Sequence, residues 1–273
     1  TAPGVPLPRM CNPRTTGMLK GGVYLDVENL TRNGGWGMRF GVITDLVRAQ
    51  GVQLLRANAY VAADFDRESM DPEYARRNKE FRNAIRRSGF HLLVKRVRRF
   101  INDDGETILK ANADLDLAVD ALVQSENLDY ILLGTGDGDF VRLVRALQNR
   151  GRRVDILSFA HTSNDLRYEA DFYFSGFLIP NLLETENGKE RYRGVLYSVS
   201  PERGYGFARV RTGLKFQDVV YDVFCHINEF QEHISNEEFQ TFKNRETVLE
   251  MDLICQPDGR YKGENIKEYA WSS

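Results

Sequence analysis

The chain has 273 residues, enough for one large domain or two domains of ordinary size. Its 37 Lys and Arg residues nearly balance 39 Asp and Glu residues, which excludes a polybasic tail protein and an acidic disordered chain. Hydrophobic residues make up 42 % of the sequence, so it can bury one or two cores, yet no apolar run is long enough for a transmembrane helix. A net charge of −2 argues against a nucleic-acid partner, unless the charges are unevenly distributed.

Strand and helix patterns alternate through the first part of the chain. Residues 1–18 contain four prolines and no signal-peptide pattern, so we expect a disordered lead-in. Apolar runs predict strands at 23–27, 52–62, 90–97, 129–133 and 153–159, and helical spacing predicts helices at 38–50, 72–87, 113–123 and 139–149. This alternation predicts an α/β domain over residues 19–180 with a mainly parallel sheet.

The rest of the chain has a different pattern. The polar run LETENGKE at 183–190 indicates a linker, whose bounds we set at 181–190, and short alternating runs with glycine-rich turns predict a small all-β domain at 191–273. Cys11, Cys225 and Cys255 form no CxxC pair, which argues against a disulfide scaffold and a structural zinc site. Their spacing therefore favours a protein of the reducing cytoplasm.

Acidic residues follow the carboxyl ends of the predicted strands. Asp26 ends the first strand and is followed by Asn29, while Asp137 and Asp139 come directly after the fourth strand. Asp114 opens the helix that precedes the fourth strand. Open parallel sheets bind ligands at this edge, and carboxylates without Cys or His favour Mg²⁺ or Mn²⁺. Such a cluster is suited to phosphodiester hydrolysis.

Most of these acids also have a structural explanation. The Asp-Gly-Asp run can be a turn in which Asp139 caps the next helix, and Asp114 can be a helix cap. Asp26 is harder to explain in this way, because a buried carboxylate is costly unless it is paired or liganded. We expect Asp116 and Asp120 to be solvated side chains on one helix face.

Basic residues are concentrated between positions 67 and 99. This segment holds eleven Lys and Arg residues and four acids, an excess of seven positive charges. A solvated helix face is the simplest explanation, but four of the cations fall on a strand-like stretch, which favours binding to RNA phosphates. The arginines expected to contact RNA from the first domain are Arg96, Arg98, Arg99, Arg142 and Arg145.

Aromatic residues alternate along two strands of the second domain. Tyr205 and Phe207 share one face of a strand, and Phe224 and His226 share one face of another. Together they predict a stacking platform for unpaired bases. They could instead form the core, but the opposite faces supply Ala208, Val223 and Ile227 for that purpose. Residues 190–273 carry a net charge of −3, so a protein-contact role is a second interpretation.

Four motifs of the first domain resemble the NYN family, the PIN-like ribonucleases that include LabA-like proteins. They are VYLDVENL at 23–30, KANADLDLAVDAL at 110–122, LLGTGDGDFVRLVRALQNRGRRV at 132–154 and SNDLRYEADFYFSG at 163–176. The resemblance covers about 155 residues and implies a metal-dependent ribonuclease. It implies Asp26, Asp114 and Asp137 as metal ligands, Asn29 as an orienting residue, and Asp139 as support for a second cation or water.

Two segments of the second domain resemble the RNP1-like and RNP2-like motifs of cold-shock domains. They are GVLYSVSPERGYGFA at 194–208 and VFCHI at 223–227, and residues 231–245 are extra. The resemblance implies a five-stranded OB-type barrel that binds RNA. Tyr197 stands where the family usually has Trp, and Arg203 where it usually has Lys, so both are expected to contact RNA.

The sequence therefore predicts a PIN-like α/β domain followed by an OB or cold-shock-like all-β barrel. We expect a cytoplasmic, Mg²⁺- or Mn²⁺-dependent endoribonuclease that acts on single-stranded RNA and has no membrane partner. The family resemblance also implies a homodimer. A non-catalytic RNA-binding regulator that retains the acids is the alternative. A phosphatase of the haloacid-dehalogenase type is disfavoured, because Glu28 stands where its second Asp is required.

Overall fold

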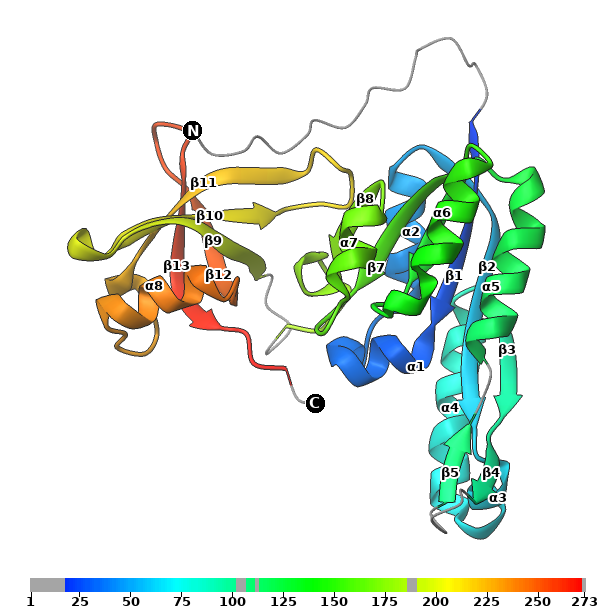
Figure 1. Ribbon diagram of the computed structural model, residues 1–273. Coiled ribbons are helices and arrows are strands. Elements are labelled where there is room, and N and C mark those ends of the chain that lie inside the picture. Colours follow the sequence, from blue (N-terminus) through cyan, green and yellow to red (C-terminus); the bar gives the residue numbers. More distant parts are fainter. Residues whose placement is uncertain (1–17, 102–106, 111–112, 186–190, 272–273) are drawn as a thin grey trace.

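The computed structural model describes residues 18–101, 107–110, 113–185 and 191–271 (Figure 1). Except for Met18, the predicted lead-in lies outside the described residues, and so does the 186–190 part of the predicted linker. The described chain forms an α/β domain and a separate β-barrel that lie side by side (Figure 1).

Six parallel strands form the sheet of the first domain. They are β1 (Leu19–Asp26), β2 (Val52–Ala63), β3 (His91–Arg96), β6 (Tyr130–Gly134), β7 (Arg153–Ser158) and β8 (Phe172–Ser175). Their order is β3-β2-β1-β6-β7-β8, and every neighbouring pair is parallel. The central strands β1 and β6 are apolar runs because both faces of the sheet are covered. The predicted α/β class is confirmed.

Seven helices of the described chain belong to this domain. They are α1 (Val27–Leu30), α2 (Phe40–Ala49), α3 (Phe65–Met70), α4 (Pro72–Arg87), α5 (Ala113–Gln124), α6 (Val141–Asn149) and α7 (Asn164–Glu169). The predicted helix at 72–87 is confirmed, because Asp71 caps its start, Pro72 occupies the first turn and Gly89 follows with a φ of 87°. The predicted helix at 139–149 instead begins with a 3-10 turn, η3 (Gly138–Phe140), before α6.

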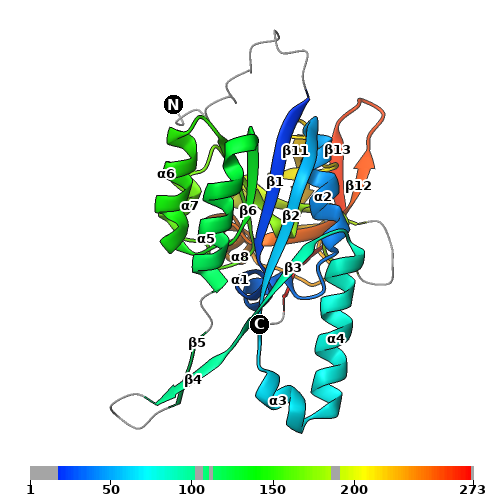
Figure 2. The same cartoon turned by 90° about the vertical axis from the view of Figure 1, so that its right-hand side faces the viewer.

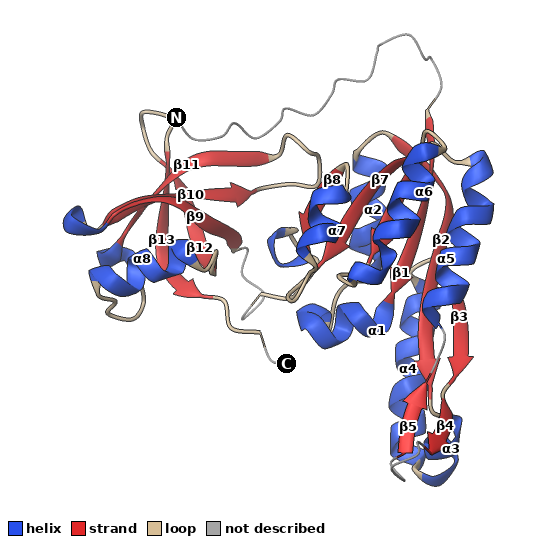
Figure 3. Cartoon of the chain, in the orientation of Figure 1, coloured by secondary structure: helices blue, strands red, loops and turns tan. Residues whose placement is uncertain are grey.

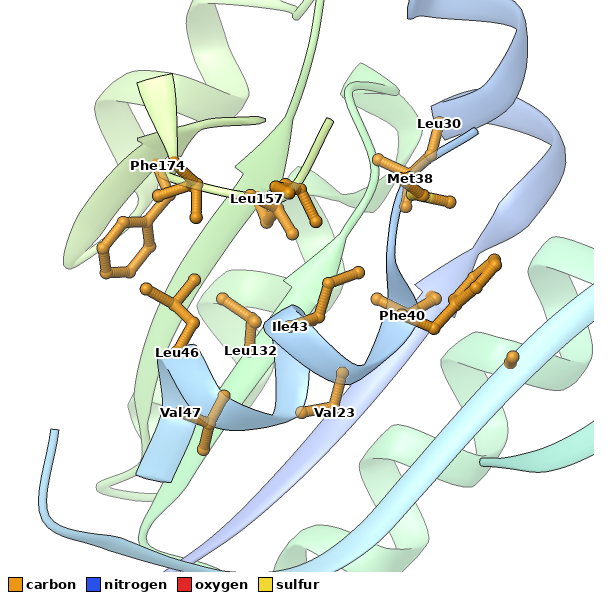
Figure 4. Packing of buried hydrophobic residues seen from close by; sticks show 14 of the residues in the cluster. Val23, Leu30, Met38, Phe40, Ile43, Leu46, Val47, Leu132, Leu157 and Phe174 are labelled. Carbon is orange, nitrogen blue, oxygen red and sulfur yellow. The ribbon is translucent and has the colours of Figure 1, made fainter. Parts of the chain in front are cut away.

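Apolar side chains cover both faces of the sheet. On one face α2 packs Ile43, Leu46 and Val47 against Val23 and Leu132 (Figure 4). The other face is covered by buried residues of α5 and α6, namely Leu117, Ala121, Leu143, Val144 and Leu147. Burial of these side chains holds the neighbouring strands β1 and β6 in the centre of the sheet. Because the two strands are parallel, their carboxyl ends lie at the same edge.

Asp120 is not a solvated helix residue, and that expectation is wrong. Its carboxylate accepts a hydrogen bond of 2.8 Å from the hydroxyl of Tyr60, which is almost fully buried in the sheet. Asp116, on the same face of α5, forms an ion pair with Lys95 at 2.5 Å. Periodicity placed the two carboxylates on one face but could not show that this face meets a tyrosine and a lysine from β2 and β3.

The first domain extends further than the predicted boundary. Leu182 and Leu183 fall in the predicted linker, but both are buried in the core of the first domain. The carbonyl of Leu182 also accepts a 2.8 Å hydrogen bond from the backbone N–H of Arg39. Two apolar residues within a polar stretch mark the last turn of the domain.

Two projections extend beyond the edge of the sheet at which α1 lies. One is the antiparallel hairpin of β4 (Arg98–Ile101) and β5 (Thr107–Lys110), and the other is formed by α3 and α4 (Figure 2). The basic segment of the sequence therefore lies on this side of the molecule.

The second domain is a closed barrel of five strands (Figure 3). They are β9 (Tyr192–Ser200), β10 (Tyr205–Arg211), β11 (Val219–His226), β12 (Val248–Cys255) and β13 (Tyr261–Glu268), in the order β10-β11-β13-β12-β9. The extra segment at 231–245 contains α8 (Asn236–Asn244), whose Phe239 is fully buried in the barrel core. The predicted five-stranded barrel is confirmed.

Aromatic side chains join the two domains. Phe216, in the loop between β10 and β11, stacks on Phe174 at 5.5 Å and lies under the guanidinium of Arg153. The backbone N–H of Phe216 donates to the side-chain oxygen of Gln50 at 3.0 Å, and the amide nitrogen of Gln50 donates to the carbonyl of Leu214 at 2.7 Å. Within the described ranges, none of the helices combines the length and apolar character needed to cross a membrane.

Candidate functional site

Asp26 is a buried carboxylate at the carboxyl end of the central strand β1. Its side chain is 7 % exposed. Oδ1 accepts a 3.0 Å hydrogen bond from the backbone N–H of Asn29, so Asp26 caps α1, and Oδ2 accepts one of 3.3 Å from the hydroxyl of Thr135. Two hydrogen bonds orient the carboxylate, and they leave lone pairs on both oxygens for another partner.

The turn after β6 lies directly beside Asp26. The side-chain oxygen of Asn29 accepts a 2.8 Å bond from the backbone N–H of Gly136, and the hydroxyl of Thr135 accepts one of 3.2 Å from the backbone N–H of Asp137. Gly134 permits this approach, because a Cβ there would lie 2.4 Å from a methyl carbon of Leu25. The two strand ends are thus cross-linked through polar side chains.

Asp137 and Asp139 occupy the η3 turn. The carboxylate of Asp137 accepts a 2.9 Å bond from the backbone N–H of Asp139, so Asp137 is the cap of this turn. The alternative in which Asp139 is the helix cap is therefore wrong. Asp139 lies within the turn, and its side chain is exposed.

The acids influence one another electrostatically. Burial is the main cause that raises the pKa of Asp26 to about 6; the negative charge of Asp114 also raises this pKa, and the hydrogen bond from the backbone N–H of Asn29 lowers it. Burial is also the first cause of the raised pKa of Asp114, followed by the negative charges of Asp137, Glu28 and Asp139. The structure therefore brings the predicted acids of β1, α5 and η3 into one electrostatic cluster.

This acidic cluster is not a closed coordination shell. Among the described residues, no three Asp, Glu, His or Cys side chains are grouped closely enough to hold a metal ion. The interacting acids nevertheless offer only carboxylate oxygens, the ligand type that Mg²⁺ and Mn²⁺ prefer. The donor chemistry thus fits a hard divalent cation, and the mutual effect of the acids on their pKa values indicates that they lie near one another.

Two residues of the cluster were missed by the sequence reasoning. Thr135 is fully buried and joins Asp26 to the backbone of Asp137. Glu28 follows Asp26 closely and raises the pKa of both Asp26 and Asp114, while it also pairs with Arg32. The sequence indicated a role for Thr135 only by its position in the Gly-Thr-Gly run, and a role for Glu28 only by its position near Asp26.

The predicted arginine contacts have different environments. Arg142 is exposed, and the described part of the chain offers it no carboxylate partner. Arg145 pairs with Glu169 at 2.7 Å, and Arg96 pairs with Asp66 at 2.5 Å. The side chains of Arg98 and Arg99 lie outside the described part of the structure. Of the three arginines in this group whose side chains the structure describes, Arg142 is the one free for an anion.

The barrel presents four aromatic rings on adjacent strands. Tyr205 stacks on Phe224 with centroids 5.7 Å apart, Phe207 lies 6.0 Å from Phe224, and His226 lies 6.4 Å from it. All four are half-buried, while the alternate residues of the same strands are buried in the core, namely Ala208, Val210, Val223 and Cys225. Ile227 lies partly buried against this core. We call the four rings the aromatic platform.

Tyr197 and Arg203 lie near the start of the barrel. Tyr197 is exposed on β9, and its hydroxyl donates to the carboxylate of Asp222. Arg203 is exposed in a short turn that ends at Gly204, whose φ is 64°. The hydrogen bond to Asp222 fixes the ring of Tyr197 but leaves its surface accessible.

The first domain of this chain is similar to a known family. The sequence profile described as "NYN domain" matches residues 20–178. The chain is similar to the Low amplitude and bright protein LabA of Synechococcus elongatus, with 27 % identity over 96 residues, which are 34 % of this chain and 52 % of that protein. The match therefore spans about half the length of this curated relative.

One solved structure is also similar to this chain. It is the crystal structure of a protein of unknown function from Vibrio parahaemolyticus, with 24 % identity and a TM-score of 0.48. The similarity covers 59 % of this chain and 95 % of that one.

Proposed function

Because this chain belongs to the NYN domain family, we propose that it is a divalent-metal-dependent ribonuclease that cuts within RNA strands. NYN domains are PIN-like and belong to a group of nucleases and RNA-binding proteins. The observation that carries the proposal is the electrostatic cluster of Asp26, Asp114, Asp137 and Asp139 at the carboxyl edge of the sheet. Like charges are gathered there at an energetic cost that a bound cation would remove.

Asp26, Asp114 and Asp137 would hold the cation, and Asp139 would support a second cation or a water molecule. A divalent ion in such a site activates water and neutralises phosphate charge. Thr135 orients the carboxylate of Asp26 through its hydroxyl. Asn29 fixes the distance between the two strand ends through the N–H of Gly136.

RNA binding would use positive charge and exposed rings. Arg142 follows Asp139 by three residues and would hold a phosphate next to the scissile one. The aromatic platform would stack unpaired bases, which requires little net charge and is compatible with an acidic barrel. We therefore propose single-stranded RNA as the substrate.

Two further features complete the proposal. Cys225 and Cys255 are free thiols, which fits a cytoplasmic location. The homodimer stays a prediction from the family resemblance.

The experiment that tests the proposal is incubation of the full chain with end-labelled single-stranded and hairpin RNAs. Parallel reactions contain Mg²⁺, Mn²⁺ or EDTA. We expect internal cleavage products with either metal and none with EDTA. Products from one end only would contradict an endonuclease, and equal cleavage in EDTA would contradict the metal.

A non-catalytic RNA-binding regulator is the second candidate. It is favoured by the structural roles of Asp26 and Asp137 as caps and by the absence, among the described residues, of a closed group of metal ligands. This candidate predicts RNA affinity without cleavage under any metal condition. The same reactions, combined with a binding measurement, therefore separate the two functions.

A further inference from the structure

A hollow of about 620 Å³ lies between α4 and the segment that follows α1. Its volume is in the range of sites that bind small molecules or single nucleotides. None of the residues that line it belongs to the acidic cluster or the aromatic platform. The lining residues are Trp36, Arg67, Tyr74, Arg77, Asn78, Glu80, Phe81, Ala84 and Arg87, and we call the hollow the Trp36 pocket.

Trp36 is the most distinctive residue of the pocket. Its side chain is 71 % exposed, although the ring is large and apolar. One side of the indole stacks on Phe81, with centroids 5.8 Å apart and planes at 15°. Phe81 in turn packs against the core of the domain. The indole is therefore held in a fixed orientation and leaves much of its surface available for a second flat ring.

The cations of the pocket are poorly compensated. Arg77 and Arg87 are exposed, and neither has a carboxylate partner within the described ranges. Arg67 lies over the ring of Tyr74 at 4.2 Å. The acid of the pocket, Glu80, pairs with Arg76 at 3.1 Å. The pocket thus combines a stacking surface with positive charge, which is the combination that binds unpaired nucleotides.

The pocket lies on the same side of the molecule as the acidic cluster. Asp26 caps α1, the chain then bends within η1 (Thr31–Gly35), where Gly34 has a φ of 104°, and Trp36 follows directly. α4 projects beyond the same edge of the sheet (Figure 2). An RNA strand that lies across the acidic cluster can therefore continue toward Trp36.

We propose that the Trp36 pocket binds an unpaired base of an RNA strand, with the base stacked on Trp36 and adjacent phosphates on Arg77 and Arg87. The proposal deepens the ribonuclease function and rests on RNA being the substrate. It assigns to the basic face of α4 the task of holding the strand on one side of the cut. Arg96, by contrast, is occupied by Asp66.

The first test is binding of a fluorescein-labelled, twelve-nucleotide oligouridylate to the full chain in EDTA, where no metal-dependent cleavage occurs. Trp36→Ala is expected to weaken binding about tenfold, because base stacking on an aromatic ring is lost. Trp36→Phe keeps a flat ring and is expected to retain most of the affinity. Unchanged affinity in Trp36→Ala would overturn the proposal.

The second test follows tryptophan fluorescence, since the chain has two tryptophans, Trp36 and Trp271. Trp271 packs against Phe177 at the domain interface. The unlabelled oligouridylate is expected to quench the emission of Trp271→Phe, in which Trp36 remains, and not that of Trp36→Phe. Quenching in Trp36→Phe alone would overturn the proposal.

The third test concerns the phosphates. Arg77→Ala and Arg87→Ala are each expected to reduce the slope of log Kd against log salt by about 0.7, as the loss of one single-strand phosphate contact does. Lys79→Ala and Arg86→Ala are the matched controls, since both side chains are exposed on α4 and neither lines the pocket. Equal effects of controls and pocket variants would overturn the assignment.

Failure of this inference is distinguishable from failure of the ribonuclease function. If wild type cleaves RNA and Trp36→Ala binds RNA with normal affinity, the pocket proposal is wrong and the ribonuclease proposal stands. If wild type does not cleave RNA but Trp36→Ala binds RNA more weakly than wild type, the ribonuclease proposal is wrong and the pocket proposal stands. If Trp36→Ala differs from wild type in the molar mass measured by light scattering but not in RNA affinity, the pocket binds a second copy of the chain. This result would overturn the proposal.

Discussion

The side-chain oxygen of Asn29 accepts a 2.8 Å hydrogen bond from the backbone N–H of Gly136. This bond joins the first turn after β1 to the turn after β6. Asp26 lies three residues before one partner, and Asp137 directly follows the other. The relative position of these two acids therefore depends on a carboxamide that carries no charge itself.

Asn29→Ala is expected to lower the cleavage rate at least tenfold, because the two strand ends lose their connection. The free energy of unfolding should fall by about 1 kcal/mol, the usual loss for one hydrogen bond. Asn29→Asp keeps an acceptor for the N–H of Gly136 and serves as the matched control for geometry. Steady-state kinetics and urea unfolding measure both effects. An unaltered rate in Asn29→Ala would contradict the positioning role.

The stability of the metal-free protein should depend on the ionisation of Asp26. Its pKa is about 6 in the folded state and near the ordinary 3.8 in the unfolded chain. The folded state thus holds the proton more tightly, so this contribution to stability is complete below pH 4 and is lost as pH rises through 6. Asp26→Asn cannot ionise and is expected to be more stable than wild type at pH 7.5, by up to about 3 kcal/mol.

The comparison of the two proteins at pH 4 is the control, since the stabilisation should be absent there. Asp155 also has a pKa raised to about 6 by burial, but it is present in both proteins and cancels in the difference. Thermal unfolding in EDTA at pH 4 and pH 7.5 provides the measurement. Equal stabilities at pH 7.5 would show that the charged carboxylate of Asp26 carries no cost.

Phe216 should couple the unfolding of the two domains. Its ring lies 4.9 Å from Phe172 and 5.5 Å from Phe174. Phe216→Ala removes these contacts, and because the ring is half-buried we expect a loss of about 2 kcal/mol, below the range for a fully buried Phe. Calorimetry should show one transition for wild type and two for the variant. Tyr168→Ala is the control, because that side chain is 87 % exposed.

The aromatic platform should contribute to RNA affinity and not to the chemical step. Phe224→Ala is expected to raise KM about tenfold with little change in kcat, because one stacked base is lost. The fold should persist, since the neighbouring residues Val223 and Cys225 form the core of the barrel. Tyr221→Ala is the control, as its exposed ring lies outside the platform. A fall in kcat alone would contradict the assignment.

Much of this fold follows from local patterns. The helix α4 could be predicted to the residue, because Asp71-Pro72 and Ser88-Gly89 are strong boundary patterns. The end of the first domain could not, because the burial of Leu182 and Leu183 depends on a core assembled from distant strands. The faces of the barrel strands could be predicted because alternate residues differ clearly in character.

The site was predictable only in part. Strand-end carboxylates such as Asp26 are unusual enough to be identified from the sequence. Thr135 and Asp120 were not, because a hydroxyl or a helix carboxylate gains its role from a partner far away in the chain. The Trp36 pocket required the structure for the same reason, since Phe81 meets Trp36 only after folding.

The most direct measurement is the initial rate of cleavage of labelled single-stranded RNA by wild type and by Asp26→Asn in Mn²⁺. Circular dichroism of both proteins serves as the control for folding. A carboxylate that holds the cation cannot be replaced by a neutral amide, so wild type should cleave and Asp26→Asn should not, with both proteins folded. Equal rates of cleavage by the two proteins would contradict a metal-dependent site at the acidic cluster.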